Sequence, residues 1–248
     1  MVRALYIAVL VILAIAISVI AIFPEDDLTV GSWFWTPATG FWMSEWSLPA
    51  LLRRVSMWPT IAIGIAALVS ILQHIIAPAS RQFMSARAAL FLFLTVAAAP
   101  VLVVNGVFKE VWDRARPVHV TQFGGPWQFT PWWQPGNGRE CRTNCSFVSG
   151  EASGAAWLAA PALLAPPAAR VPLLAGVAAY TAVISGLRMA FGGHFLSDTL
   201  IAILITLVMI AAAHRWLYRR PNAVPEDVWA ARLARLGAPL RRLAGRPG

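Results

Sequence analysis

The sequence predicts an all-α integral membrane protein, a bundle of six helices with both termini on the cytoplasmic side. Two properties of the composition favour this class: 58% of the 248 residues are hydrophobic and only 12% are charged, whereas soluble domains carry about 25% charged residues. The third observation is that apolar residues gather in runs close to the length of about 20 residues that spans a bilayer. A disordered chain and a typical cytosolic enzyme are therefore excluded.

Six apolar runs are expected to span the membrane. The first, residues 4–23, has no charged residue and is too long for the core of a cleaved signal peptide, so it is interpreted as a signal anchor. The other five are residues 60–77, 88–108, 149–169, 171–187 and 195–213. Pro161, Pro166 and Pro167 interrupt the fourth run, and membrane helices tolerate proline where neighbouring groups satisfy the backbone.

These spans divide the chain into three parts. Residues 1–59 combine the signal anchor with a Trp-rich outer loop, residues 60–213 form the core, and residues 214–248 form a basic cytoplasmic tail. The expected inner segments hold twelve basic and two acidic residues, whereas the outer segments and helix ends hold eight basic and nine acidic residues. Because Lys and Arg accumulate on the cytoplasmic side, this asymmetry places the long loops 24–59 and 109–148 outside.

Two further segments have the pattern of surface helices. Residues 48–55 are typical of an amphipathic helix lying on the membrane, with Arg53 and Arg54 toward the headgroups. The basic tail is either an interfacial helix on the anionic inner leaflet, broken near Pro239, or a partly disordered segment that only sets the topology.

Ionisable side chains are nearly absent from the middle of the spans and gather at their expected outer ends. They follow the third span, open the fourth, end the fifth and open the sixth: Lys109, Arg114, Arg116, Glu151, Arg188, His194 and Asp198. Charged groups at membrane depth are costly and usually mark function. The sequence therefore predicts one outward-facing site at the depth of the lipid headgroups.

The residue types at this site favour a phosphate ligand. Lys109, Arg116 and Arg188 provide three cations, and the arginine fork matches phosphate oxygens in bidentate fashion. Ser149 and Gly150 stand at an expected helix start, where free N–H groups and the positive dipole end attract an anion. Gly150 would also let the backbone approach the ligand closely.

A histidine and two carboxylates supply the reactive groups. His194 and Asp198 are four residues apart, so they share a helix face if both lie on the helix. A carboxylate bonded to one imidazole nitrogen leaves the other nitrogen basic, which makes His194 a plausible nucleophile and Asp198 its orienting partner. Glu151 could donate a proton to the leaving oxygen if burial raises its pKa.

Each of these residues also has a purely structural interpretation. Lys109 and Arg116 could be anchors that extend toward the interface, His194 and Asp198 could be a structural pair, and Gly150 could belong to a helix-packing face. Taken singly these interpretations are favoured, but their convergence on one side of the membrane favours a functional site.

The three motifs resemble those of the type 2 phosphatidic acid phosphatase family, the membrane lipid phosphatases of the vanadium-haloperoxidase-like superfamily. The family pattern is K-x6-RP, PSGH and SR-x5-H-x3-D. Residues 109–117 match the first motif fully, and residues 188–198 match the third except that Leu187 replaces the serine. The second motif, residues 148–151, matches in part, because Glu151 takes the place of the acid histidine. The resemblance extends over about residues 60–213.

The resemblance implies a role for each matching residue. The residues implied to hold the phosphate are Lys109, Arg116, Ser149, Gly150 and Arg188. His194 is implied to attack phosphorus and form a phosphohistidine, with Asp198 as its orienting partner. Such enzymes use no metal, and no cofactor is expected. Since an ordinary glutamate is ionised at neutral pH, either the pKa of Glu151 is raised, or His119 is the acid, or the enzyme is slow or acts on an easy leaving group.

The resemblance therefore leads us to expect a metal-independent lipid phosphatase in a bacterial inner membrane, with its site facing the periplasm. Lipid A is favoured as substrate because the aromatic outer loops could frame a sugar headgroup; undecaprenyl diphosphate, phosphatidylglycerol phosphate and phosphatidic acid are alternatives. A lipid phosphotransferase, a transporter and an inactive lipid-binding protein are the rival functions. The expected partners are the lipid substrate and the bilayer, with no nucleic acid and no obligate protein partner.

The two cysteines, Cys141 and Cys145, lie in the second outer loop. Thiols oxidise readily outside the inner membrane, so we expect a disulfide that closes this short loop, with free thiols as the alternative. Such a bond would restrain the segment that leads into Ser149.

Overall fold

The structure is a computed structural model that describes residues 2–136, 141 and 144–243. In this part of the chain, five helices are long and apolar enough to cross a membrane: Val2–Ile22, Ser47–Ile76, Ala86–Val111, Pro167–Ala190 and Leu196–Arg219. The helical class is confirmed. Six spans were expected and five are found in the described residues; the missing one is the fourth.

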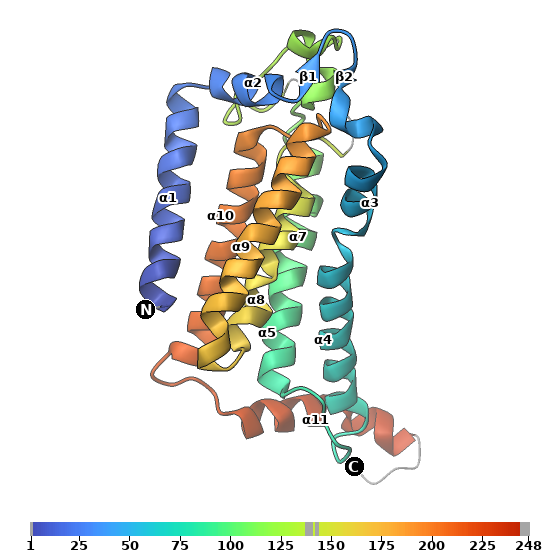
Figure 1. Cartoon of the computed structure of the whole chain (residues 1–248). Coiled ribbons are helices and arrows are strands. Elements are labelled where there is room, and N and C mark those ends of the chain that lie inside the picture. The colour runs from blue at the N-terminus through green and yellow to red at the C-terminus, as the bar shows by residue number, and fades with distance from the viewer. Residues whose placement is uncertain (1, 137–140, 142–143, 244–248) are drawn as a thin grey trace.

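The fourth expected span, residues 149–169, is two short helices in place of one long helix. These are α7 (Gly150–Trp157) and α8 (Ala159–Leu164). Pro161 has no N–H to donate to the carbonyl four residues earlier, so the hydrogen-bond ladder is interrupted where α7 ends. Both helices lie among the long helices of the bundle (Figure 1), and every residue of α7 except Glu151 is buried.

The chain turns earlier after this segment than the sequence suggested. Ala165 is extended, with ψ 160°, as expected for a residue that precedes a proline. Pro167 then occupies the first turn of α9 (Pro167–Ala190), a position that needs no N–H donor. The expected runs 149–169 and 171–187 therefore do not meet in a turn near residue 170, because that part of the chain belongs to α9.

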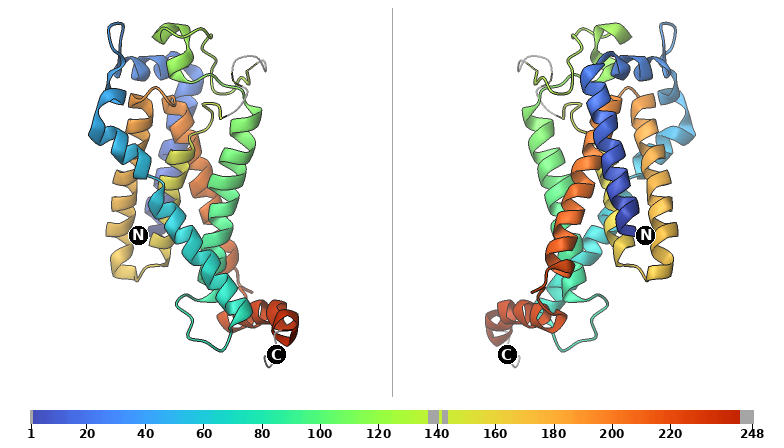
Figure 2. Two further views of the ribbon diagram at one scale, coloured as in Figure 1. Left: turned by 90° about the vertical axis from the view of Figure 1, so that its right-hand side faces the viewer. Right: turned by 90° about the vertical axis from the view of Figure 1, so that its left-hand side faces the viewer.

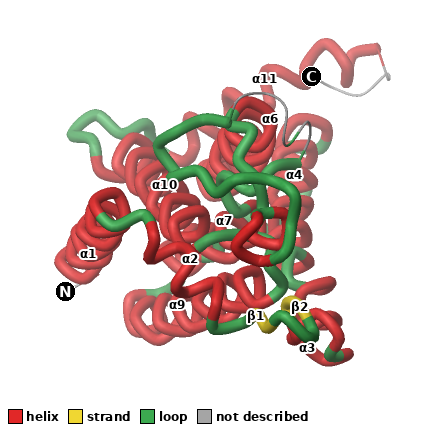
Figure 3. Tube along the Cα trace, turned by 90° about the horizontal axis from the view of Figure 1, so that it is seen from above, coloured by secondary structure: helices red, strands yellow, loops and turns green. Residues whose placement is uncertain are grey.

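The long helices run side by side (Figure 1). They are α1 (Val2–Ile22), α4 (Trp58–Ile76), α5 (Ala86–Val96), α9 and α10 (Leu196–His214). Seen from above, α1 stands at the edge of the bundle, and it contacts α10 (Figure 3). Buried hydroxyl groups join the interior helices: Ser153 and Thr206 lie 2.7 Å apart, and the indole of Trp157 donates to Thr95.

The helix that begins as α5 changes its winding before it reaches the site. Residues Ala97–Phe108 form a π-helix that contains Pro100, and the short helix α6 (Lys109–Val111) follows. Proline removes one backbone donor from the ladder, and π-helical turns inside helices often occur at functional sites. The side-chain amide of Asn105 donates to the carbonyl of Pro100 at 2.6 Å, so the loosened turn keeps a hydrogen-bond partner.

One end of the bundle is covered by short elements that we call the cap. The cap contains α2 (Glu25–Ser32), the antiparallel hairpin β1 (Trp35–Thr36) and β2 (Gly40–Phe41), α3 (Ser47–Val55), and 3-10 turns at Trp42–Glu45, Pro117–His119 and Thr121–Phe123. α3 confirms the helix expected at residues 48–55. Phe41 packs on Phe123 and also against Gly192, where a Cβ atom would lie 2.5 Å from the ring. The cap is thus fitted onto the turn between α9 and α10.

The tail crosses the opposite end of the bundle as α11 (Glu226–Leu243), which contacts α4 and α5 (Figure 2). A Cβ atom on Gly237 would lie 1.9 Å from the carbonyl oxygen of Ile75, so only glycine permits this approach. The expected break at Pro239 is wrong. Pro239 is exposed, and water can bond the carbonyl that it leaves without a donor.

The charge asymmetry predicts how the bundle is oriented. We expect a cysteine introduced by Ala38→Cys, in the hairpin turn of the cap, to react with an impermeant maleimide added to spheroplasts. Ala79→Cys, between α4 and α5, should react only after the membrane is opened. Both positions are exposed and the native cysteines are joined to each other, so they do not compete. The reverse pattern would contradict an outward-facing cap.

Candidate active site

The motif residues of the sequence meet where the cap covers the bundle. His194 lies in the turn before α10, and Glu151 lies in the first turn of α7. Arg188 lies in the last turn of α9. Glu151 contacts both of the others: its two oxygens lie 3.3 Å from Nε of Arg188 and 3.7 Å from Nε2 of His194. Two segments far apart in the sequence, the start of α7 and the turn between α9 and α10, thus share one charged centre.

The geometry of His194 fixes its tautomer. The side chain is 1% exposed, and Nδ1 lies 2.6 Å from the carbonyl oxygen of Ser146. A carbonyl only accepts, so in neutral His194 the hydrogen is assigned to Nδ1 and the lone pair to Nε2. Burial lowers the pKa of His194 to about 4. At neutral pH the histidine therefore carries an available lone pair on Nε2, which has no hydrogen-bond partner among the described atoms.

Asp198 does not hold His194 in the way the sequence suggested. Its nearest oxygen lies 3.9 Å from Nδ1 of His194, beyond hydrogen-bond distance. That oxygen instead accepts from the Ser146 hydroxyl at 2.5 Å and from the backbone N–H of Phe195 at 2.8 Å. The expected direct bond is therefore wrong: Asp198 fixes Ser146, and the carbonyl of Ser146 fixes His194.

Ser146 is a site residue that sequence reasoning missed. It lies three residues before Ser149 in irregular backbone, so neither helical spacing nor a family motif identifies it. Its backbone N–H also donates to the carbonyl of Arg114 at 2.9 Å. Both its backbone and its side chain are thus fixed by groups from distant segments.

Glu151 is ionised in the free protein. Burial by itself would raise its pKa, but the neighbouring cations Arg188 and Lys109 lower it well below the usual range. A raised pKa in the free protein, one of the explanations considered for glutamate at this position, thus has no support. The carboxylate occupies the space between a cation and the lone pair of Nε2, where an anionic ligand would be attracted.

The start of α7 provides backbone N–H groups at the site. The Ser149 hydroxyl accepts from the N–H of Ala152 at 3.3 Å, and the Ser149 N–H donates to the carbonyl of Asp198 at 3.1 Å. Ser149 therefore caps the helix and fixes its direction. The next N–H groups, of Gly150 and Glu151, have no acceptor within the helix. These groups and the helix dipole make this end of α7 suitable for an anion.

Gly150 is required by the close approach of the Asn105 amide, and a cation lies beside it. A Cβ atom at this position would lie 2.6 Å from Oδ1 of Asn105 and 3.2 Å from Nζ of Lys109. A larger residue would therefore displace both side chains. The expected association of Lys109 with the start of α7 is present in the structure.

Asn144, which the motifs do not include, connects two of the cations. Its side-chain oxygen accepts from Nζ of Lys109 at 3.2 Å and from Arg116 at 3.0 Å, and its carbonyl accepts from Arg116 at 2.7 Å. Its φ of 51° is in the left-handed region, where asparagine is one of the few tolerated side chains. Asn144 thus positions Lys109 and Arg116 relative to each other.

A disulfide between Cys141 and Cys145 closes the loop that contains Asn144. The backbone N–H of Cys141 donates to Asp113 at 2.7 Å. Among the described residues, Asp113 and the two sulfur atoms form a group that is close enough to hold a metal ion. The sulfurs are bonded to each other, however, so they are not thiolate ligands.

His119 makes no described contact with the reactive groups. Its ring is exposed and packs edge-on against Trp127, with ring centres 5.0 Å apart. Partial burial and the neighbouring charge of Arg116 lower its pKa. None of the contacts described for His119 reaches Glu151 or His194, so the structure does not place it beside them.

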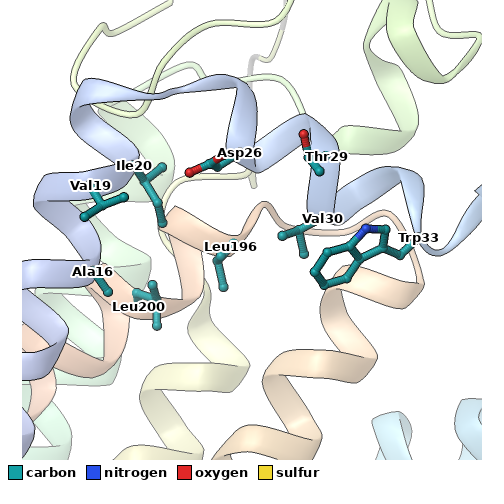
Figure 4. A pocket seen from close by; sticks show the side chains of 9 residues that line it. All are labelled: Ala16, Val19, Ile20, Asp26, Thr29, Val30, Trp33, Leu196 and Leu200. Carbon is teal, nitrogen blue, oxygen red and sulfur yellow. The ribbon is translucent and has the colours of Figure 1, made fainter.

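The described part of the chain also has hollows outside this centre. A hollow of about 390 Å³ lies between α1, α2 and α10 (Figure 4), and its lining includes Asp26, Trp33 and Leu196 but no predicted site residue. An apolar groove of about 580 Å³ lies along α1, α9 and α10. It includes Ser185, one helical turn before Arg188. The groove therefore ends close to the site, within the spanning part of the bundle.

The fold is a helical membrane bundle, and its site holds a buried neutral histidine among cations. This combination is suited to phosphate chemistry in a membrane protein. The chain belongs to the PAP2 superfamily, whose family model matches residues 88–222, more than half of its length. This confirms the family resemblance carried by the three motifs.

Three bacterial relatives are similar to part of the chain, and each is named lipid A 4'-phosphatase. The protein of Rhizobium leguminosarum is 41% identical over 119 residues, which cover 48% of this chain and 50% of the relative. That of Rhizobium etli is 43% identical over 114 residues, covering 46% and 43%. That of Francisella tularensis subsp. novicida is 36% identical over 144 residues, covering 54% and 60%. The similarity spans about half the length of these relatives, and no solved structure matches the chain.

The position of Asn144 predicts an effect on substrate binding. We expect Asn144→Gly and Asn144→Ala each to raise the KM for a phosphorylated lipid by about 3- to 10-fold, because both lose the bonds to Lys109 and Arg116. The Ala variant should melt at a lower temperature than the Gly variant, since only glycine avoids the cost of about 1–2 kcal/mol of a Cβ in the left-handed region. An unchanged KM in the Gly variant would show that the side chain does not organise the cations.

Proposed function

We propose that this protein is a lipid phosphatase of a bacterial inner membrane, with its site at the periplasmic face and lipid A as its preferred substrate. The observation that carries the proposal is the free lone pair of His194, held beside Glu151 and Arg188 by the carbonyl of Ser146. A neutral, fixed imidazole among cations is suited to attack an anionic phosphorus centre.

In the proposed reaction the substrate phosphate binds between the cations and the start of α7. Its oxygens take the place of Glu151 on Arg188 and are also bound by Lys109 and Arg116. The lone pair of Nε2 attacks phosphorus, and the bond between phosphorus and the lipid oxygen breaks. The leaving oxygen takes a proton and departs as the lipid hydroxyl.

Water completes the cycle. Its oxygen attacks phosphorus, the bond between phosphorus and Nε2 breaks, and inorganic phosphate leaves. The electron pair returns to Nε2, so His194 is again neutral with its hydrogen on Nδ1. The bond from Nδ1 to Ser146 supports the positive charge that His194 carries while the phosphoryl group is attached.

Glu151 is the proposed proton carrier for both steps. In the free protein the cations lower its pKa, so it is a carboxylate. Bound phosphate brings negative charge that offsets those cations, which favours the acid form in the complex. Glu151 then protonates the leaving oxygen in the first step and takes a proton from water in the second.

Two observations support a lipid substrate of the lipid A type. The relatives that are similar to half of the chain are named lipid A 4'-phosphatase. The apolar groove along α1, α9 and α10 ends one turn from Arg188. Acyl chains at this groove can remain in the bilayer while the phosphate of the same lipid reaches the site. The charged groups of the candidate site lie near the ends of the spans and not at mid-depth, which favours an enzyme over a transporter.

Phosphate release from defined lipids tests this function. We expect purified protein to release phosphate from lipid A faster than from undecaprenyl diphosphate, phosphatidylglycerol phosphate or phosphatidic acid. His194→Ala should abolish release because the covalent route is lost, whereas His119→Ala should retain at least half of the activity, since no described contact joins His119 to Glu151 or His194. Near wild-type turnover by His194→Ala would contradict the mechanism. Transfer of the phosphate to a second lipid would instead indicate a phosphotransferase.

Glu151 gives a prediction with a defined pH dependence. Glu151→Gln keeps the shape of the side chain but has no transferable proton, so kcat should fall by about 10²–10⁴-fold with little change in KM. Wild-type kcat should fall as pH rises, because the acid form in the complex is lost, and the Gln variant should lack this alkaline decline. Glu151→His should recover part of the activity below about pH 6.5. A Gln variant as fast as wild type would exclude Glu151 as the acid.

A further inference from the structure

The cap contributes one buried carboxylate beside the candidate site. Asp27, in α2, is 1% exposed, and its Oδ2 lies 2.8 Å from Nη2 of Arg114, whose side chain is fully buried. Nη1 of Arg114 lies 2.5 Å from Asp198. One guanidinium thus joins two carboxylates that come from elements more than 150 residues apart.

Asp27 also bonds the first turn of α10 directly. Its Oδ1 accepts from the backbone N–H of Ser197 at 2.8 Å, and its Oδ2 accepts from the Ser197 hydroxyl at 2.6 Å. Burial, opposed by Arg114 and Ser197, raises the pKa of Asp27. Every described partner nevertheless donates to this carboxyl, and such an arrangement favours the ionised form. Ser197 precedes Asp198, so α2 holds the start of the helix that the site depends on.

A continuous series of buried hydrogen bonds connects Asp27 to the histidine. Arg114 bonds Asp198, Asp198 accepts from the Ser146 hydroxyl at 2.5 Å, and the Ser146 carbonyl lies 2.6 Å from Nδ1 of His194. With Asp27 ionised, two negative charges and one positive charge lie behind His194. The net negative charge favours an imidazole that becomes cationic when it binds a phosphoryl group.

We propose that Asp27 is a positioning residue for the histidine chemistry, holding Asp198 and the start of α10 through Arg114 and Ser197 and supplying the charge that makes the group behind His194 net negative. This inference rests on the proposed function. Asp27 lies outside residues 88–222, the part that the family model matches. The cap thus completes a site whose other groups lie within the matched segment.

The neighbouring acid on α2 provides a matched control. Asp26 is partly exposed and lines the hollow of Figure 4, whereas Asp27 faces Arg114. Asp26→Asn and Asp27→Asn make the same change of charge and size one residue apart. Only Asp27→Asn removes a charge from the buried group.

The experiment compares these two variants on whichever lipid of the panel the wild-type protein hydrolyses fastest. Asp27→Asn should lower kcat by about 10- to 100-fold, the loss expected for one charge-assisted hydrogen bond that acts in the transition state, with KM changed less than threefold. The charged groups that face His194 are Glu151 on α7, Arg188 on α9 and Asp198 on α10. All three remain in the variant, so a displaced limb would report the loss of Asp27. The acid limb of the pH profile should move to lower pH, because loss of one distant negative charge lowers the pKa of His194. Asp26→Asn should keep wild-type kcat and the wild-type limb.

Each outcome decides the inference. Equal kcat and an equal acid limb in the two variants would overturn it. A lower kcat for Asp27→Asn without a displaced limb would also overturn it, since that result indicates only a structural role. If Asp27→Asn does not fold, Ser197→Ala removes the hydroxyl shared by Asp27 and Arg114, and unchanged kcat in that variant would overturn the proposal. If wild-type protein and Asp26→Asn release no phosphate from any lipid, the proposed function fails and this inference falls with it.

Discussion

Arg114 is a permanent positive charge with no access to water, and the junction of cap and bundle depends on satisfying it. Its guanidinium bonds Asp27, Asp198 and the carbonyl of Thr130, and it lies 4.4 Å from the ring centre of Phe195. Removing one partner from such a buried group costs about 3–5 kcal/mol, because the remaining charge is left uncompensated. Since the partners come from α2, the second long loop and α10, satisfying this one side chain fixes three segments relative to one another.

The candidate site follows from that fixed junction. Asp198 is held by Arg114 on one side and bonds Ser146 on the other, and the Ser146 carbonyl determines which nitrogen of His194 keeps its lone pair. The imidazole is thus oriented by a backbone carbonyl, and the carboxylate acts one bond further away. Burial keeps His194 neutral, so orientation and protonation state are both set before a ligand arrives.

Glu151 has a different relation to the site, because its charge balances the cations only while the site is free. It lies within 4 Å of both Arg188 and His194, the place that suits a phosphate oxygen. An anionic ligand therefore competes with a group of the protein itself, and the same competition changes the protonation of Glu151. In the proposed mechanism, this coupling lets a glutamate occupy the position of an acid histidine.

The sequence by itself determined the helices and the end of the bundle at which the chemistry lies. Apolar runs predicted α1, α4, α9 and α10 to within a few residues, because burial in a bilayer demands a local and continuous pattern. The motif spacing placed Arg188 and His194 at the same end of the bundle for the same reason, since each lies at the end of a predictable helix.

Only the tertiary structure decided which groups touch. Asp27, Ser146 and Asn144 lie in irregular segments or in the cap, and Asp27 bonds a residue 170 positions away. Such contacts have no periodic signal along the chain, because a hydrogen bond between distant segments depends on distances and angles that exist only after those segments fold together.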